Sequence, residues 1–138
     1  MPPRERIDQI HHQEDACRLS LEWGISLATI DLLVQAANQY WDETRGRVTL
    51  ISGYRTRAEQ AELGRAGRPA AADNLSTHRS CPATGADISL GDFPTRAQIA
   101  TWGRIAVMNG LRWGGGSPVD EAGIPSDWGH VDMGRRTS

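Results

Sequence analysis

Apolar residues recur every three or four positions in the first third of the chain, which is the spacing of a helix that buries one face. The clearest such stretch follows Ser26, a residue that can cap a helix N-terminus, and continues to Trp41. A weaker helical pattern covers residues 5–22. We therefore predict one helix over residues 5–22 and a second from Ser26 to Trp41, with Gly46 ending the second unit.

Capping boxes indicate two further helices. In such a box, a Ser or Thr and a Glu or Gln three residues later satisfy each other's backbone donors in the first turn. Thr56 and Glu59 form one pair, and Thr95 and Gln98 form the other. Glycine favours the position just after a helix. The glycines expected to end these two helices are Gly67 and Gly110.

Short apolar runs between the helices read as strands. The predicted strands cover residues 48–52, 85–90, 111–113 and 130–133, and residues 68–84 and 114–129 read as loops. Short strands with irregular connections favour an α+β fold with a small, mostly antiparallel sheet flanked by helices. The 138 residues contain no internal repeat, and their number fits a single domain, so we expect one domain over residues 1–138.

Composition and charge exclude some partners. The formal net charge is −2, and no basic field is present to bind nucleic acid or an anionic membrane surface. No run approaches the ~18 apolar residues of a membrane-spanning helix, and no signal-peptide pattern is visible. We expect synthesis in the cytoplasm and no membrane insertion. Two cysteines, Cys17 and Cys81, are not forced to pair.

Strand alternation brings possible metal ligands onto one surface. In the strand from Asp87, Ile88 faces the core and Asp87 the opposite side; in the strand from His130, Val131 faces the core and His130 the opposite side. If the two strands are neighbours, Asp87 and His130 converge, and His78 from the preceding loop can join them.

Two imidazoles and one carboxylate form a donor set of catalytic zinc sites, with a fourth position left to water. Asp127, three residues before His130, is placed to act as the general base that such chemistry needs. The alternative from spacing alone is that residues this far apart are unrelated, because no HExxH motif is present. His11 and His12 lie among polar residues and read as part of a solvated helix face.

Three blocks of sequence resemble the M15 zinc metallopeptidases, specifically the L-alanyl-D-glutamate endopeptidases of bacteriophage endolysins, which share a fold with D-Ala-D-Ala carboxypeptidases and hedgehog domains. Residues 52–63 read SGYRTRAEQAEL, similar to the family's SGYRTxAEQxxL. Residues 76–88 contain Ser-Thr-His and Gly-Ala-Asp-Ile, similar to SxHxxGxAxD. Residues 110–132 contain GLRWGG and DWGHVD, similar to GLxWGG and DxPHFE. The resemblance covers about residues 25–133, the expected core of the domain.

This resemblance implies a function and a set of roles. The chain would be a peptidoglycan peptidase with one zinc ion (Zn²⁺), cutting a stem-peptide bond, L-Ala–D-Glu by analogy. It would act on the cell wall after holin-type release, and we expect a monomer. The ligands would be His78, Asp87 and His130. Asp127 and Arg55 would be catalytic, with Arg55, Tyr54 and Ser76 contacting the substrate.

Some features depart from the family pattern and leave alternatives open. His78 and Asp87 are nine positions apart rather than seven, with two residues inserted around Cys81. Gly129 and Val131 replace the usual Pro and Phe beside the last ligand. A D-Ala-D-Ala carboxypeptidase or dipeptidase, or a zinc-stabilised binding module without turnover, remains the alternative function. Cys81 reads as a loop thiol, with an extra zinc ligand or a nucleophile as its alternatives.

Overall fold

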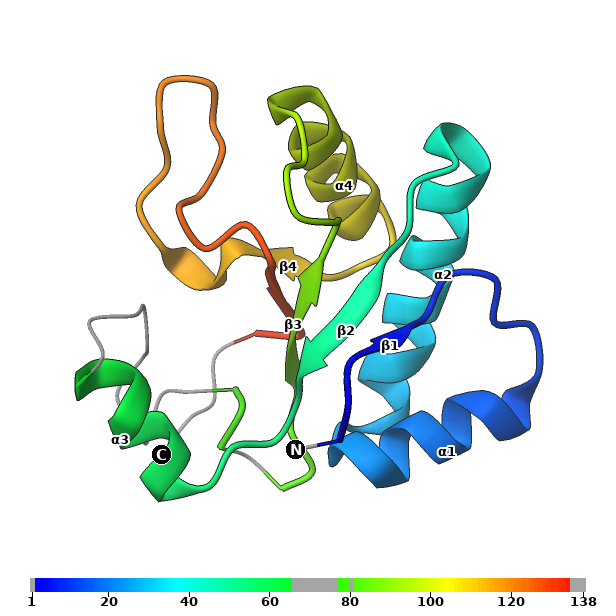
Figure 1. The fold of residues 1–138 in the computed structure, drawn as a ribbon, viewed down its shortest axis with the longest axis vertical. Helices are drawn as coiled ribbons and strands as arrows, with labels where there is room; N and C mark the ends of the chain where they lie inside the picture. Colours follow the sequence, from blue (N-terminus) through cyan, green and yellow to red (C-terminus); the bar gives the residue numbers. More distant parts are fainter. Residues whose placement is uncertain (1, 66–76, 80, 135–138) are drawn as a thin grey trace.

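A computed structural model describes residues 2–65, 77–79 and 81–134 of the chain. Figure 1 shows the helices and strands. In chain order they are β1 (Glu5–Arg6), α1 (Gln13–Trp23), α2 (Leu27–Thr44), β2 (Thr49–Ser52), α3 (Arg57–Arg65), β3 (Gly85–Ser89), α4 (Arg96–Met108), β4 (Arg112–Trp113), the 3₁₀ turn η1 (Gly114–Gly116) and β5 (His130–Asp132).

The strands form one five-stranded sheet in the order β1-β2-β3-β5-β4, and every neighbouring pair is antiparallel. Together with the helices α1 to α4, this sheet confirms the predicted α+β class. β3 and β5 lie side by side, although more than 40 residues separate them along the chain. The predicted site depends on that pairing.

One face of the sheet packs against α1, α2 and α4 (Figure 1). Fully buried core side chains from these helices include Leu19, Ile30, Leu33, Tyr40, Trp102 and Ile105, each at most 1% exposed. Leu50, Ile88 and Val131 supply the sheet's share. In Figure 1, α3 stands apart from this core, beyond the end of β2. The sheet face away from the core is therefore available for polar side chains near α3.

The predicted helix over residues 5–22 is wrong at its start. Residues Glu5–Arg6 form β1 and pair with β2, and the helix begins at Gln13. The amide of Ile7 donates to the carbonyl of Val48 at 2.9 Å, and the Ile7 side chain is fully buried. Tertiary pairing with β2 overrides the weak helical pattern of this segment.

The remaining predicted helix starts are confirmed. The hydroxyl of Ser26 accepts from the amide of Thr29 at 3.2 Å. The box at Thr56 and Glu59 makes both of its hydrogen bonds, as does the box at Thr95 and Gln98.

Helix ends were predicted less well. Arg45, with φ of 57°, takes the left-handed position after α2 that had been assigned to Gly46. Gly110 takes a φ of 92° just after Asn109, the C-cap of α4, as expected. Gly67 lies outside the described residues.

Two other expectations concern the whole chain. None of the helices in the described part combines the length and apolar character needed to cross a bilayer. Cys17 and Cys81 are both free thiols, and Cys81 is exposed.

Candidate metal centre

The pairing of β3 with β5 sets Asp87 directly opposite His130. Their neighbours Ile88 and Val131 point into the core, at 2% and 0% exposure. Because side chains alternate along a strand, the carboxylate and the imidazole emerge together on the other face. The prediction that these two residues converge is confirmed.

His78 reaches the same place from the segment before β3. Its carbonyl accepts from the amide of Arg55 at 2.7 Å, and the carbonyl of Thr77 accepts from the amide of Thr84 at 3.0 Å. The second bond joins the two ends of the segment 77–84, so that His78 stays beside β3 despite the longer spacing. The unusual nine-residue spacing is therefore compatible with convergence.

Three donor atoms of these side chains face one another. His78 Nε2 lies 3.2 Å from His130 Nδ1 and 3.4 Å from Asp87 Oδ1, and His130 Nδ1 lies 3.1 Å from the same oxygen. Donor atoms of the three residues lie within 4.8 Å of one another and could hold a metal ion. Both rings are buried, at 2% and 7% exposure. Two imidazoles and one carboxylate are a set that zinc accepts in catalytic sites.

The ring nitrogens that face away from the cluster have their own partners. His78 Nδ1 lies 2.6 Å from the carbonyl oxygen of Gly53, and His130 Nε2 lies 2.6 Å from Asp132 Oδ2. Metal-binding histidines use their second nitrogen in this way, which fixes the tautomer and the ring orientation. The chain therefore orients both imidazoles with the inner nitrogens toward Asp87.

Asp132 is fully buried and is held in turn by Arg112. The two residues face each other across β4 and β5, and the guanidinium donates twice to the carboxylate, at 2.9 and 2.8 Å. Burial alone would raise the pKa of Asp132, but the hydrogen bonds from His130 and Arg112 lower it well below its usual range. Alternation along β5 accounts for Asp132 sharing a face with His130, whereas Arg112 could be found only from the strand register.

The same contacts shift the pKa values of His130 and Asp87. Burial alone would lower the pKa of His130, but its hydrogen bonds to Asp132 and Asp87 outweigh burial and raise it to about 9. For Asp87, the opposing effects are burial, which raises its pKa, and the charges and hydrogen bonds of His78 and His130, which lower it well below its usual range. Asp87 is therefore an ionised carboxylate at neutral pH.

Glycines allow the backbone to approach His130 closely. Gly115, at φ of 62°, lies against the imidazole, and a Cβ there would fall 2.8 Å from the ring carbon Cδ2. A Cβ at Gly85 would collide with Thr77 and approach His130. The glycine run 114–116 lacks the Lys and Ser/Thr of a phosphate loop. It instead lets the backbone pack against the His130 ring at Gly115.

Asp127 is half-buried just before β5. Its amide donates to the hydroxyl of Ser117 at 3.1 Å, and its carbonyl accepts from the amide of His130 at 3.0 Å. Burial raises the pKa of its carboxyl group, the charge of Asp87 raises it further, and the positive charges of His130, His78 and Arg55 oppose this. The carboxyl group of Asp127 therefore lies within the electrostatic reach of the cluster.

Arg55 also belongs to this site. It is 8% exposed, and its guanidinium forms an ion pair with Oδ2 of Asp87, the oxygen that does not face the histidines. Arg55 thus lies beside the cluster, and its catalytic and substrate-binding roles stay predictions.

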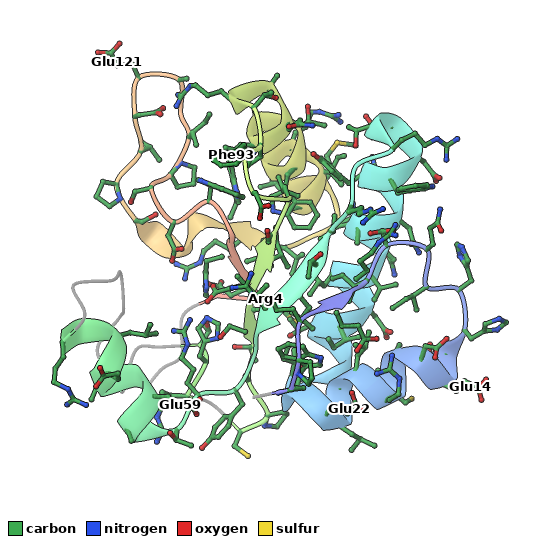
Figure 2. All side chains as sticks on the ribbon, viewed as in Figure 1. Arg4, Glu14, Glu22, Glu59, Phe93 and Glu121 are labelled. Carbon is green, nitrogen blue, oxygen red and sulfur yellow. The ribbon has the colours of Figure 1, made fainter. Side chains whose placement is uncertain are left out.

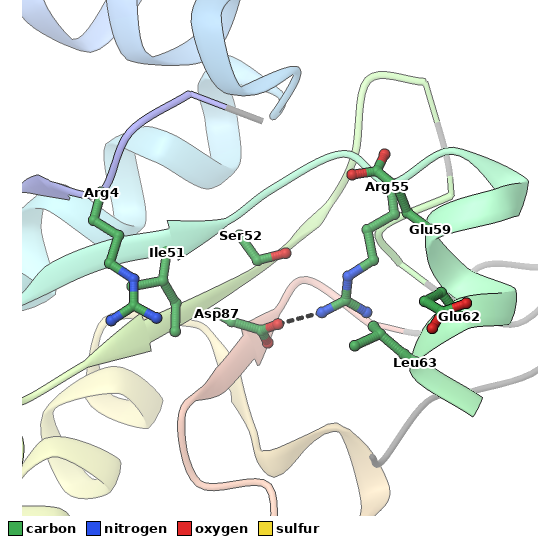
Figure 3. A pocket seen from close by; sticks show the side chains of 8 residues that line it. All are labelled: Arg4, Ile51, Ser52, Arg55, Glu59, Glu62, Leu63 and Asp87. Carbon is green, nitrogen blue, oxygen red and sulfur yellow. Dashed lines mark hydrogen bonds and ion pairs between the residues drawn. The ribbon is translucent and has the colours of Figure 1, made fainter. Parts of the chain in front are cut away.

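A cavity of about 340 Å³ adjoins the cluster at Asp87 and Arg55. Figure 3 shows Arg4 on one side of it, Glu59, Glu62 and Leu63 from α3 on the other, and Ser52 and Asp87 between them; Ile51 completes the lining. Arg4 and the α3 carboxylates were not predicted, since nothing in the sequence relates residue 4 to residues 59–63.

The other residues singled out from the sequence have different positions. Tyr54 does not line the cavity, and its hydroxyl accepts from Arg79 at 3.0 Å. Ser76 lies outside the described residues. Cys81 belongs to none of the metal-ligand groupings in the described part of the chain. His11 and His12 are exposed at the surface, as expected.

Comparison with known proteins gives a match in structure but not in sequence. No family model and no curated protein matches the sequence. The chain is similar to the crystal structure of the Serratia marcescens L-Ala D-Glu endopeptidase ChiX, with a TM-score of 0.55 and 16% identity. The match covers 87% of this chain and 84% of that one. At this identity the likeness shows that the two chains share a fold.

Proposed function

We propose that this chain is a zinc-dependent peptidase of the M15 type that hydrolyses a peptidoglycan stem peptide, at the bond between L-Ala and D-Glu. The observation that carries the proposal is the buried convergence of His78, Asp87 and His130, whose inner donor atoms face one another while their outer atoms are held by the protein. The shared fold with an L-Ala D-Glu endopeptidase supports the choice of bond.

His78, Asp87 and His130 would hold one zinc ion. When bound, zinc lowers the pKa of a water molecule toward about 7 and polarises the substrate carbonyl. Asp127 takes a proton from the attacking water and delivers it to the leaving amine nitrogen. The raised pKa of Asp127 suits this exchange, because a general base works best when its pKa is near the working pH.

Arg55 would stabilise the transition state by its charge. Its guanidinium lies beside Asp87 in the cavity wall, where it can face the negative charge that develops on the carbonyl oxygen. The same ion pair keeps Asp87 in place. We further propose that residues 1–138 act as one peptidase domain and reach the cell wall by holin-type release.

The test is digestion of purified peptidoglycan, followed by mass spectrometry of the fragments. We expect fragments with new L-Ala carboxyl ends and D-Glu amino ends. Treatment with a chelator should stop the release of these fragments. Trimming of the terminal D-Ala instead would favour a carboxypeptidase. Zinc binding without release of fragments from any peptidoglycan would favour a binding module.

Asp127→Ala separates catalysis from metal binding. Because the carboxyl group is not one of the three ligands, the variant should retain zinc but lose about 10²- to 10⁴-fold in kcat, the usual contribution of a general base. Full activity in this variant would overturn the role of Asp127.

A further inference from the structure

Within the cavity described above, the negative charges already have partners. Asp87 is paired with Arg55, and Glu62 with Arg65. Glu59 accepts from the amide of Thr56 at the start of its own helix. None of the three carboxylates needs a ligand for compensation.

Arg4, an exposed residue at the rim, is the exception among the charged groups that line the cavity. In residues 2–65, 77–79 and 81–134, its guanidinium makes no hydrogen bond and no ion pair. It precedes β1, and the pairing of Glu5 with Leu50 carries it onto the end of the cavity opposite α3 (Figures 2 and 3). The cavity thus has a cationic end, built on the edge strand of the sheet.

Ser52 supplies a buried, unsatisfied group in the same wall. It is 5% exposed, and its hydroxyl has no hydrogen-bond partner in the described structure. The register of β2 shifts between Leu50 and Ser52, so that Ser52 lies opposite Asp87 and both Ile51 and Ser52 line the cavity. A buried hydroxyl without a partner costs free energy, and because this one lines a cavity, a ligand there can complete its bonding.

We propose that Arg4 and Ser52 form a carboxylate subsite beside the metal centre, and that it binds the free α-carboxylate of the stem-peptide D-Glu. This assignment rests on the proposed function. In the stem, D-Glu is linked onward through its side-chain carboxyl, so its α-carboxylate is free and is attached to the carbon that carries the scissile nitrogen. A guanidinium and a hydroxyl donor are the groups that such a carboxylate requires.

The binding experiment uses zinc-loaded Asp127→Ala protein, which prevents turnover during titration. The probes are three Ala-γ-D-Glu-Lys peptides. One has a free α-carboxylate on D-Glu and an amidated C-terminus, one has both groups amidated, and one has a carboxylate at the C-terminus only. We expect the first peptide to bind about 10-fold more tightly than the other two, the range of one charge-assisted hydrogen-bond pair.

Arg4→Gln should abolish that preference by weakening only the first peptide. Arg47→Gln, at an exposed arginine before β2 that does not line the cavity, is the matched control and should leave all three dissociation constants unchanged. A preference that survives Arg4→Gln, or that follows the C-terminal carboxylate, would overturn the proposal.

Ser52→Ala distinguishes a ligand-binding role from a structural one. Removing a hydroxyl that bonds to nothing should leave the melting temperature equal or higher, while binding of the first peptide weakens several-fold. A lower melting temperature with unchanged binding would mean that Ser52 only supports the fold.

The outcomes also separate this subsite from the proposed function. If the wild-type protein cleaves walls at L-Ala–D-Glu without preference for the free α-carboxylate, the subsite is wrong and the function stands. If the first peptide binds selectively but no wall is cleaved, the subsite stands and the function is wrong. If the protein neither binds these peptides nor cleaves walls, both are wrong.

Discussion

Two buried aspartates at opposite ends of the sheet, Asp8 and Asp132, have similar surroundings. Asp8 follows β1 and accepts from Arg6 at 2.7 Å and from the backbone amide of Val48 at 2.9 Å. Asp132 ends β5 and accepts two bonds from Arg112. Both side chains are fully buried.

The two aspartates differ in whether the carboxylate also contacts a histidine ring. Among the described residues, the hydrogen bonds of the Asp8 carboxylate reach only Arg6 and the amide of Val48, and they join β1 to the residue before β2. At Asp132 the network continues to His130 Nε2, and the opposite nitrogen of that ring faces His78 and Asp87. A buried, paired carboxylate is therefore not a sign of function by itself. The sign that we use instead is a chain of hydrogen bonds that ends on a ring nitrogen facing other potential metal-ligand atoms.

Changing a ligand should give the largest effect. His130→Ala removes one of three proposed donors and leaves Asp132 without its imidazole partner. We expect loss of zinc affinity well beyond 100-fold and no measurable wall digestion. Asp8→Asn is the matched control at the other end of the sheet, and it should bind zinc as the wild type does. Competition with a chromogenic chelator measures both affinities.

Asp132→Asn should have a smaller but clear effect on the metal. The amide cannot accept from His130 Nε2 and from Arg112 as an ionised carboxylate does, so the ring loses its fixed orientation. Loss of such an outer partner lowers metal affinity about 10- to 100-fold. Asp8→Asn should instead lower the free energy of unfolding by about 1–3 kcal/mol, the cost of impairing a buried hydrogen-bonded charge, with unchanged zinc affinity. Equal zinc affinities in the two variants would remove the distinction between them.

The metal-free protein should lose stability as the pH rises. The pKa of His130 is raised from 6.5 to about 9, so its contribution is complete below pH 6.5 and is lost between pH 6.5 and about 9. At about 1.4 kcal/mol per pKa unit, the rise from 6.5 to about 9 corresponds to a loss on the order of 3 kcal/mol. Urea unfolding in a chelator across this pH range measures it, and His130→Gln should flatten the profile. A flat wild-type profile would contradict the pairing of His130 with the two carboxylates.

Arg112→Gln should give the smallest effect. The guanidinium acts on the metal through two other side chains, and its own side chain is 34% exposed, so that water can replace part of its contact with Asp132. We expect less than a 10-fold loss in zinc affinity. A loss as large as that of Asp132→Asn would mean that Arg112 determines the position of the carboxylate.

Local sequence signals predicted the elements that form from local interactions. Two capping boxes and the single N-cap Ser26 located the starts of three helices, and alternation set Asp87 and His130 on the polar face of their strands. The segment around Ile7 was mistaken for helix, because its strand exists only through pairing with β2. For the same reason Arg4, Arg112 and the carbonyl of Gly53 were not foreseen, since each joins the site through contacts between distant parts of the chain.

The central claim is that His78, Asp87 and His130 hold one divalent ion. Anomalous diffraction at the zinc edge from crystals of the zinc-loaded protein tests it most directly. We predict one strong peak bonded to Nε2 of His78, Nδ1 of His130 and a carboxylate oxygen of Asp87. A peak elsewhere, or none between these three side chains at full zinc loading, would contradict the claim.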